Sequence, residues 1–394
     1  MQTKLFNAMM SIVVIIICAS CGSSPQQNAA TETPVQSALT STLTNTATPT
    51  STITLTPVPP VKPLGTGPVR VRNRTLETDF DGDGRYERFP VQGAAFSPVP
   101  IGGGIGDPRV TPVLYDRSLA LLAAMHADTI RTYGGTDPVL LRKAAAAGIR
   151  VIVGYWVPLD MDLSDSANRK SVLDGFVRLV AELKDEPGVL LWNIGNEQNW
   201  NNGNTRAWYS LVQELAVAAY GIEGPGYHPV CASNGGFSNI GDAAFGADDA
   251  SLTYMDLWCS NDYKSDFTPS FNAFRTRTTK PIVLTEFGID ALDHRTRQEY
   301  EAEQESFDGA NWSQILAASD VCAGGTVFEF TDEWWKAGDP LSHDFGGGPN
   351  SSHPDGYSNE EWWGLVAVTP DTNGDGLDEW RPRRVYYMFQ RAWT

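Results

Sequence analysis

Two glutamates end short apolar runs and are the residues best suited to do chemistry together. Glu197 closes the run LLWNIGNE, which begins at Leu190, and Glu286 closes the run PIVLTE, which begins at Pro281. Short apolar runs of this kind predict buried strands. In a barrel of parallel strands the chemistry lies at the carboxyl ends of the strands, so we expect the two carboxylates to face each other across the barrel mouth.

A facing pair of carboxyl groups suits the cleavage of a glycosidic bond with retention of configuration. One carboxylic acid protonates the leaving oxygen, and one carboxylate attacks the anomeric carbon. The acid needs a raised pKa, whereas the nucleophile must stay charged. Asn196, directly before Glu197, adds an amide that can hydrogen-bond a sugar 2-hydroxyl. The alternative is that Glu197 and Glu286 are ordinary capped or salt-bridged glutamates at helix starts.

The elements that must position these residues alternate between short β-branched runs and longer helical patterns. Strands are predicted at residues 91–96, 129–132, 151–154, 189–193, 229–232, 257–260, 282–285 and 326–330. Helices are predicted at residues 114–126, 138–147, 170–184, 205–220, 269–276 and 295–319, with Gly148 and Gly221 as helix ends. Long irregular insertions stand between the fifth and sixth strands and after the eighth. Eight such repeats predict the α/β class and a (β/α)8 TIM barrel.

With strand numbers assigned, the sequence resembles clan A of the glycoside hydrolases. In that clan the acid/base follows an Asn at strand four and the nucleophile ends strand seven, and the motifs WNIGNE (192–197) and TEFG (285–288) match both. Within the clan the chain is similar to family 2 catalytic barrels and to the β-1,3-glucan-processing families 17 and 72. The resemblance implies a glycosidase with Glu197 as acid/base and Glu286 as nucleophile, no catalytic cofactor, and a β-linked substrate, with a β-glucan favoured.

The same resemblance implies supporting residues around the nucleophile. Arg131, at the end of the second strand, is expected to hydrogen-bond the nucleophile. Tyr263, after the sixth strand, is expected against the nucleophile, with Asn261 as a rival for the substrate contact. Trp334, after the eighth strand, is expected to form the floor of the site that binds the sugar at the cleaved bond. Trp335 could take this place instead.

Other residues near the predicted rim carry alternatives. Glu329, Asp332 and Glu333 compete for a catalytic role but lie in neither motif. Trp156 and Trp200 are interpreted as sugar platforms that could equally belong to the core.

Two acidic loops share the spacing D-x-[DN]-G-D-G-x-x-E, which could hold structural Ca²⁺. Oxygen ligands at the first, third, fifth and ninth places suit calcium, and the glycines permit the tight turn. The loops resemble the short calcium turns of dockerins or integrin-type repeats. Asp-Gly-rich hairpin turns without metal are the alternative. The ligands would be Asp79, Asp81, Asp83 and Glu87 in the first loop, and Asp371, Asn373, Asp375 and Glu379 in the second.

The N-terminal sequence indicates export. Residues 1–21 read as a lipoprotein-type signal, with Cys21 as the lipidated residue, although Cys18 stands where the lipobox usually has Leu. Residues 22–66 are rich in Thr, Ser and Pro and predict a disordered linker. Residues 67–394 then form one catalytic domain. We expect a protein lipid-anchored at the bacterial cell surface or periplasmic face, or secreted, whose only membrane contact is the anchor.

Composition narrows the classes of partner. The net charge of −18 and the lack of a basic stripe exclude nucleic acid, whereas neutral sugars suit both the charge and the 12 Trp and 13 Tyr. Five His, none in an H-x-H or H-E-x-x-H arrangement, disfavour a metal-dependent hydrolase. Beyond the signal, Cys231 and Cys259 could bridge or stay buried thiols, and Cys322 remains.

Two further functions stay open beside hydrolysis. A transglycosylase would use the same glutamates with an acceptor sugar in place of water. A carbohydrate-binding surface lipoprotein without activity would only present aromatic residues. We expect a monomer in each case, and the segment 331–359 will decide whether the site is a pocket or an open cleft.

Overall fold

The computed structural model describes residues 58–200 and 205–394 of the chain. The predicted signal, Cys21 and most of the predicted linker lie outside these residues. The described residues belong to a compact unit that extends to Thr394. No helix among them is long and apolar enough to cross a membrane.

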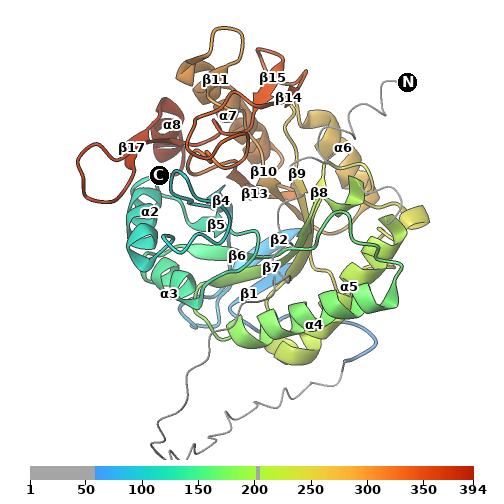
Figure 1. Cartoon of the computed structure of the whole chain (residues 1–394). Coiled ribbons are helices and arrows are strands. Elements are labelled where there is room, and N and C mark those ends of the chain that lie inside the picture. The colour runs from blue at the N-terminus through green and yellow to red at the C-terminus, as the bar shows by residue number, and fades with distance from the viewer. Residues whose placement is uncertain (1–57, 201–204) are drawn as a thin grey trace, which may run out of the picture. The chain divides into compact units, whose positions relative to one another are not determined.

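Eight parallel strands close into a barrel at the centre of the fold (Figure 1), which confirms the predicted (β/α)8 architecture. The order around the barrel is β10-β13-β4-β5-β6-β7-β8-β9, so each strand pairs with its neighbours in the chain and β13 closes the ring onto β4. The strands are β4 (Val91–Ala95), β5 (Thr129–Arg131), β6 (Arg150–Tyr155), β7 (Val189–Asn196), β8 (Val230–Gly235), β9 (Trp258–Asn261), β10 (Ile282–Glu286) and β13 (Cys322–Val327).

Helices surround the barrel, as Figure 1 shows. They are α2 (Pro112–Ala124), α3 (Pro138–Ala146), α4 (Ser166–Leu183), α5 (Thr205–Glu223), α6 (Thr268–Arg277), α7 (Glu301–Ala317) and α8 (Arg384–Ala392). Local sequence explains several of their ends. The side chain of Asp137 accepts a hydrogen bond from the Val139 amide at the start of α3, and Asp165 caps α4 in the same way. Gly148, just after α3, has a φ of 78°, which glycine adopts without a steric penalty.

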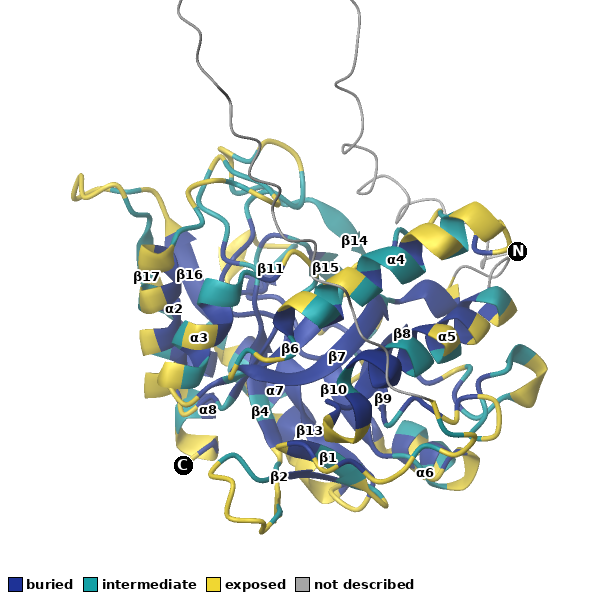
Figure 2. Ribbon diagram, turned by 90° about the horizontal axis from the view of Figure 1, so that it is seen from below, coloured by how far each residue is buried: buried dark blue, intermediate teal, exposed yellow. Residues whose placement is uncertain are grey.

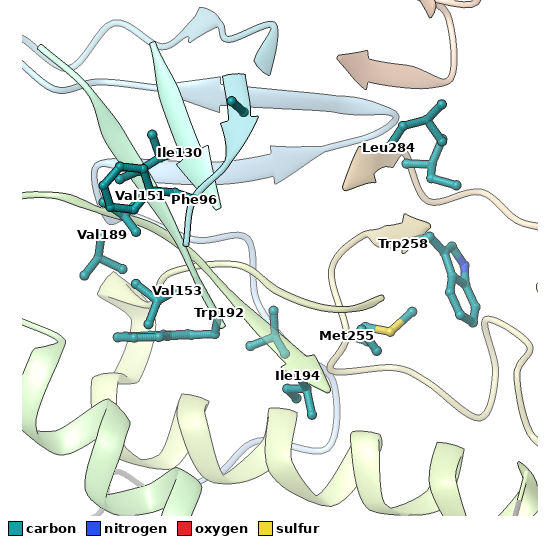
Figure 3. Close-up of a cluster of buried hydrophobic side chains, with 14 of the residues drawn as sticks. Phe96, Ile130, Val151, Val153, Val189, Trp192, Ile194, Met255, Trp258 and Leu284 are labelled. Atoms are coloured by element: carbon teal, nitrogen blue, oxygen red, sulfur yellow. The ribbon is translucent and has the colours of Figure 1, made fainter. Parts of the chain in front are cut away.

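Alternation along β7 sorts its side chains into two layers. Trp192 and Ile194 face the helices, where they join the large core that includes Phe176 of α4 and Leu211 of α5 (Figure 3). Leu191 belongs instead to a second cluster of buried residues. Burying each large apolar side chain stabilises the fold by about 1.5–3 kcal/mol, so these two layers hold the rim residues in place.

A small antiparallel sheet shares the second cluster with the barrel strands. It comprises β1 (Val69–Arg72), β2 (Thr75–Thr78) and β3 (Glu87–Arg88). Val69 and Leu76 are fully buried in the same cluster as barrel residues such as Val91 and Val283, near the start of their strands. Figure 2, seen from below, shows this sheet beneath the strands. The sheet therefore closes the barrel at the end opposite the carboxyl rim.

A disulfide bond joins Cys231 of β8 to Cys259 of β9, and Cys322 is a buried free thiol. The sequence left open whether Cys231 and Cys259 are bridged or are buried thiols, and in the structure they are bridged. The bond ties two neighbouring barrel strands.

Several predicted boundaries were wrong. The last barrel strand begins at Cys322 and ends at Val327, although the amides of Phe328 and Phe330 still donate to the carbonyls of Phe287 and Ala95. The helix predicted at 295–319 begins only at Glu301, since a hairpin of β11 (Leu292–Asp293) and β12 (Gln298–Glu299) precedes it.

Other elements differ because tertiary packing outweighs local signals. Gly221 is buried within α5, which continues to Glu223, so it does not end the helix. Lys62 already bonds to the barrel, with its Nζ 2.6 Å from a carboxylate oxygen of Asp256, and the Thr66 amide donates to the Pro225 carbonyl at 2.8 Å. The folded part therefore starts before the predicted boundary at residue 66.

Candidate active site

Glu197 and Glu286 both lie at the carboxyl rim of the barrel and are 5% exposed. Glu197 directly follows β7, and Glu286 is the last residue of β10. The pairing register shifts just before each of them, between Ile194 and Asn196 in β7 and between Leu284 and Glu286 in β10. Such bulges redirect side chains, which is common beside active sites. Glu197 also has a φ of 62°, a conformation that is uncommon for residues other than glycine.

Three side chains donate hydrogen bonds to the Glu286 carboxylate. Arg131 Nη1 lies 2.6 Å from Oε1, the Tyr133 hydroxyl lies 2.8 Å from the same oxygen, and the Tyr263 hydroxyl donates to Oε2. Arg131 is fully buried, so water screens its charge little. Burial raises the pKa of both tyrosines well above the usual value, so their hydroxyls keep the protons that they donate. Arg131 and Tyr263 therefore occupy the predicted positions beside Glu286.

Glu197 has a different environment. Its carboxyl oxygen accepts one hydrogen bond, from Asn261 Nδ2 at 2.9 Å. Burial raises the pKa of Glu197 to about 8, and the nearby negative charge of Glu286 adds to this, while Asn261 and Arg131 oppose it. Glu197 is thus suited to hold a proton at neutral pH.

Two asparagines connect the surroundings of the two glutamates. Asn196 Oδ1 accepts from Arg131 Nη2 at 2.7 Å and from Asn261 Nδ2 at 3.0 Å. Asn261 Oδ1 in turn accepts from Thr285 Oγ1 at 2.9 Å. These contacts occupy the carbonyl oxygen of Asn196, whereas its amide nitrogen bonds to no described residue. Asn196 therefore has donors to offer a sugar hydroxyl, as predicted, and Asn261 acts within the network.

A second charged group follows β13. Lys336 Nζ lies 2.6 Å from Glu333, 3.5 Å from Glu329 and 4.0 Å from the centre of the Phe328 ring. Burial raises the pKa of Glu329 well above the usual value, and the charge of Glu333 adds to the effect. These acids are engaged with a lysine, which sets them apart from Glu197 and Glu286.

Asp332, the third competing acid, is part of a buried structural pair. Its two oxygens each accept a hydrogen bond from Arg383 at 2.7 Å, and both side chains are fully buried. This bidentate pair anchors the start of α8 to the segment after β13.

The tryptophans after β13 differ in what they contact. Trp334 stacks on His343, with ring centres 4.6 Å apart, and Trp335 lies 6.0 Å from Lys336. The indole that packs on Tyr263 is that of Trp363, at 5.0 Å. Trp363 is therefore a better candidate than Trp334 for the aromatic wall beside the nucleophile.

Trp156 and Trp200 are the tryptophans with large exposed areas in the described part of the chain, at 42% and 45%. Trp156 follows β6 directly. The Trp200 ring lies against Gly235 at the end of β8, so closely that a Cβ at Gly235 would come within 2.3 Å of it. Neither indole is a core residue, which leaves both free to act as the predicted platforms.

Both acidic loops adopt ordered turns. In the first, carboxylate oxygens of Asp79, Asp81 and Asp83 lie within 4.8 Å of one another, and the Gly84 amide donates to Asp79. In the second, Asp371 accepts hydrogen bonds from the amides of Gly374 and Gly376, and its ninth residue, Glu379, accepts one from Thr372. The ninth residue of the first loop, Glu87, is exposed in β3. The donor set of the first loop fits a calcium ion, which prefers carboxylate oxygens.

Tyr133 and Trp363 were missed in the sequence. Tyr133 could have been found, since it stands two residues after Arg131 and so projects at the same rim. Trp363 gives no such signal, because a long irregular segment separates it from β13.

The fold and the paired glutamates define a (β/α)8 barrel that carries two buried carboxyl groups at its carboxyl rim. Solved structures with similar barrels include a family 2 β-galacturonidase from Eisenbergiella tayi bound to galacturonate (16% identity, TM-score 0.58, covering 84% of this chain and 54% of that chain). Another is a β-D-glucuronidase for Dictyoglomus thermophilum (17%, 0.55, 84% and 54%). A third is a mutant of Saccharomyces cerevisiae Gas2p in complex with laminaritetraose and laminaripentaose (14%, 0.54, 83% and 67%).

At these identities the similarity establishes the fold that the resemblance predicted. The chain spans about half the length of the first two solved chains. No family model and no curated protein matches the sequence.

Proposed function

We propose that the protein is a retaining β-glycosidase, with Glu286 as the nucleophile and Glu197 as the acid/base. The observation that carries this proposal is the contrast between the two glutamates. Glu286 faces one positive charge and two hydroxyl donors, whereas Glu197 is buried beside a single amide and has a pKa of about 8. Environments that separate two carboxyl groups in this way assign the acid and the nucleophile.

The first step forms a glycosyl ester. A Glu286 oxygen bonds to the anomeric carbon, the bond to the leaving oxygen breaks, and the Glu197 proton passes to that oxygen. In the second step Glu197, now a carboxylate, takes a proton from water while the water oxygen bonds to the anomeric carbon and Glu286 leaves. The sugar thus keeps its configuration.

The surrounding residues hold the nucleophile and the sugar through both steps. Arg131, Tyr133 and Tyr263 fix the orientation of the Glu286 carboxylate and stabilise the charge that returns when the ester breaks. Asn196 is placed to donate to the sugar 2-hydroxyl through its unbonded amide nitrogen.

The charges around the site favour a neutral sugar. A uronate carboxylate is best bound by a cation that is free to pair with it, and three described cations on the strands and loops of this rim are already engaged. Arg131 pairs with Glu286, Lys336 with Glu333, and Lys264 with Asp262 at 3.0 Å. We therefore propose a neutral β-glucan, β-1,3-linked by the resemblance to families 17 and 72, and not a uronide.

The experiment compares nitrophenyl β-glucoside, β-galactoside and β-glucuronide with linked glucan, mannan, xylan and galactan oligosaccharides. We expect turnover of a neutral β-glycoside, with NMR showing the β-anomer as the first product. An α-anomer as first product, or turnover confined to the glucuronide, contradicts the proposal. Products longer than the substrate would identify transfer to an acceptor sugar in place of hydrolysis.

We also propose export with a lipid anchor on Cys21, which rests on the sequence alone. The expected result is that the full chain incorporates labelled palmitate and that Cys21→Ser does not. Equal labelling of both proteins would contradict the anchor.

A further inference from the structure

A cavity of about 350 Å³ lies between the loops that follow β5 and β6 and the helix α4. Its walls come from the loop after β5, the end of β6 and the outer face of α4, where Gly134, Trp156, Arg178 and Glu182 line it. The volume lies at the lower end of the range of about 300–1,000 Å³ that is usual for small-molecule sites. It is therefore large enough for a sugar unit.

The loop after β5 links this cavity to the catalytic centre. Gly134 directly follows Tyr133, whose hydroxyl donates to Glu286. Trp156 directly follows β6, the neighbour of β7, which leads into Glu197. The cavity therefore borders two of the loops that follow barrel strands next to the catalytic centre.

The lining groups suit a neutral sugar. The Trp156 indole is 42% exposed and offers an apolar face to the C–H groups of a sugar ring. Arg178 and Glu182 stand one turn apart on the exposed side of α4, and neither makes an ion pair with a described residue. Sugar hydroxyls can accept from the guanidinium and donate to the carboxylate, and the two opposite charges leave no net charge to attract an ionic ligand.

Glycines shape the cavity. A Cβ at Gly134 would come 3.2 Å from the Trp156 Cβ, and Gly135 has a φ of 60° with open space where its Cβ would lie. On α4, Gly175 lets the Tyr155 ring approach, since a Cβ there would come 2.2 Å from the tyrosine hydroxyl oxygen. Larger residues at these positions would fill or deform the cavity.

We infer that this cavity is a second sugar-binding site, which stacks a unit of a neutral β-linked glycan on Trp156 away from the bond that is cleaved. The identity of the ligand rests on the proposed function, whereas binding itself needs no catalysis. The consequence is that the protein acts on long chains, whose interior units can occupy the cavity and the catalytic centre together.

The test measures binding in a protein that cannot turn over its ligand. The full chain with Glu286→Gln is run by affinity electrophoresis through gels that contain soluble β-1,3-glucan, β-1,4-mannan, β-1,4-xylan or β-1,4-galactan. We expect retardation by at least one polysaccharide, and Trp156→Ala in this background should weaken it about fivefold to tenfold.

Two further variants make the result specific. Arg178→Ala with Glu182→Ala changes only exposed side chains on α4 and should also weaken retardation. Tyr387→Ala removes an equally exposed aromatic ring, 46% exposed on α8, and should leave retardation unchanged. Unchanged thermal unfolding of the Trp156 variant shows that the effect is local.

The outcomes separate this inference from the proposed function. No retardation by any of the polysaccharides, or equal retardation with and without Trp156, overturns the second site even if the wild-type protein hydrolyses glycosides. Retardation that depends on Trp156, in a protein whose wild-type form cleaves none of the test substrates, supports the site and contradicts the catalytic proposal.

Discussion

The guanidinium of Arg131 lies 2.6 Å from the carboxylate of Glu286 and has no exposed surface. Its other terminal nitrogen donates to Asn196, the residue before Glu197. One side chain on β5 thus connects the ends of β7 and β10, so the two glutamates keep a fixed relation to each other. A buried arginine in this position favours a catalytic use, since charges are costly to bury without one.

Removing Arg131 should damage both stability and activity. Arg131→Ala leaves the buried Glu286 without its cation, so we expect a loss of about 3–5 kcal/mol in unfolding free energy. The matched control is Arg142→Ala, whose exposed pair with Glu186 should contribute about 1 kcal/mol or less. Chemical denaturation measures both, and similar losses in the two variants would contradict the role of Arg131.

Glu286→Ala should abolish turnover, because no group remains to form the ester. Azide or formate should not restore ordinary retaining chemistry. An anion that enters the vacated space attacks the sugar on the face that Glu286 used and leaves a product of inverted configuration. Product NMR in the presence of azide tests this, and a retained product at wild-type rate would contradict the assignment.

Glu197→Ala should act selectively according to the leaving group. A poor leaving group needs the proton, so we expect its turnover to fall by a factor of about 10²–10⁴, whereas an activated dinitrophenyl glycoside should lose far less in the first step. Steady-state kinetics on the two substrates provide the measurement. Equal losses would count against an acid role for Glu197.

The pH dependence should follow Glu197. Since its pKa is about 8 and the protonated form is the active acid, kcat/KM for a substrate with a poor leaving group should fall as pH rises above about 8. The alkaline limb should disappear in Glu197→Ala. A limb that persists in this variant belongs to another group.

Stability should respond to the same proton. The pKa of Glu197 rises from its ordinary value of 4.5 to about 8, so the folded state binds the proton more tightly than the unfolded chain. The resulting stabilisation is complete below about pH 4.5 and is lost as pH rises toward 8. Glu197→Gln, which cannot ionise, should therefore have a higher Tm than the wild type at pH 7.5 and a similar one at pH 4. A lower Tm at pH 7.5 would contradict the raised pKa.

We propose structural Ca²⁺ in the first acidic loop. Chelation should then lower Tm, added calcium should restore it, and Asp81→Asn with Asp83→Asn should remove this sensitivity. Asp371→Asn tests the second loop in the same assay. A Tm that chelators leave unchanged would contradict the proposal.

Sequence reasoning located the parts of the site that depend on local pattern. Glu197, Glu286 and Arg131 each end a short run that predicts a strand, and parallel strands bring such ends to one rim, so it could be predicted that the three lie close together. The position of Trp363 beside Tyr263 could not be predicted in this way. The Glu329 amide donates to the Trp363 carbonyl, and the Leu365 amide donates to the Glu329 carbonyl. The segment 363–365 therefore lies alongside residue 329 through contacts between distant residues, which the hydrophobic periodicity of the sequence does not predict.

Elements outside the barrel repeat were harder to predict for the same reason. Strand β12 lies within the helix predicted at 295–319, and α8 was not predicted at all. The start of α8 is held by Arg383, whose partner Asp332 lies far away in the sequence. In such a segment, one buried ion pair between residues far apart in the sequence fixes where the element lies.

The pair between Lys62 and Asp256 governs how the protein can be prepared. Both side chains are less than one tenth exposed, so a fragment cut at residue 67, where the linker was predicted to end, would leave the buried Asp256 carboxylate without its paired lysine. Such a fragment should unfold more readily and give misleading kinetics for every variant. Expression should therefore start upstream of residue 58, so that Lys62 is retained.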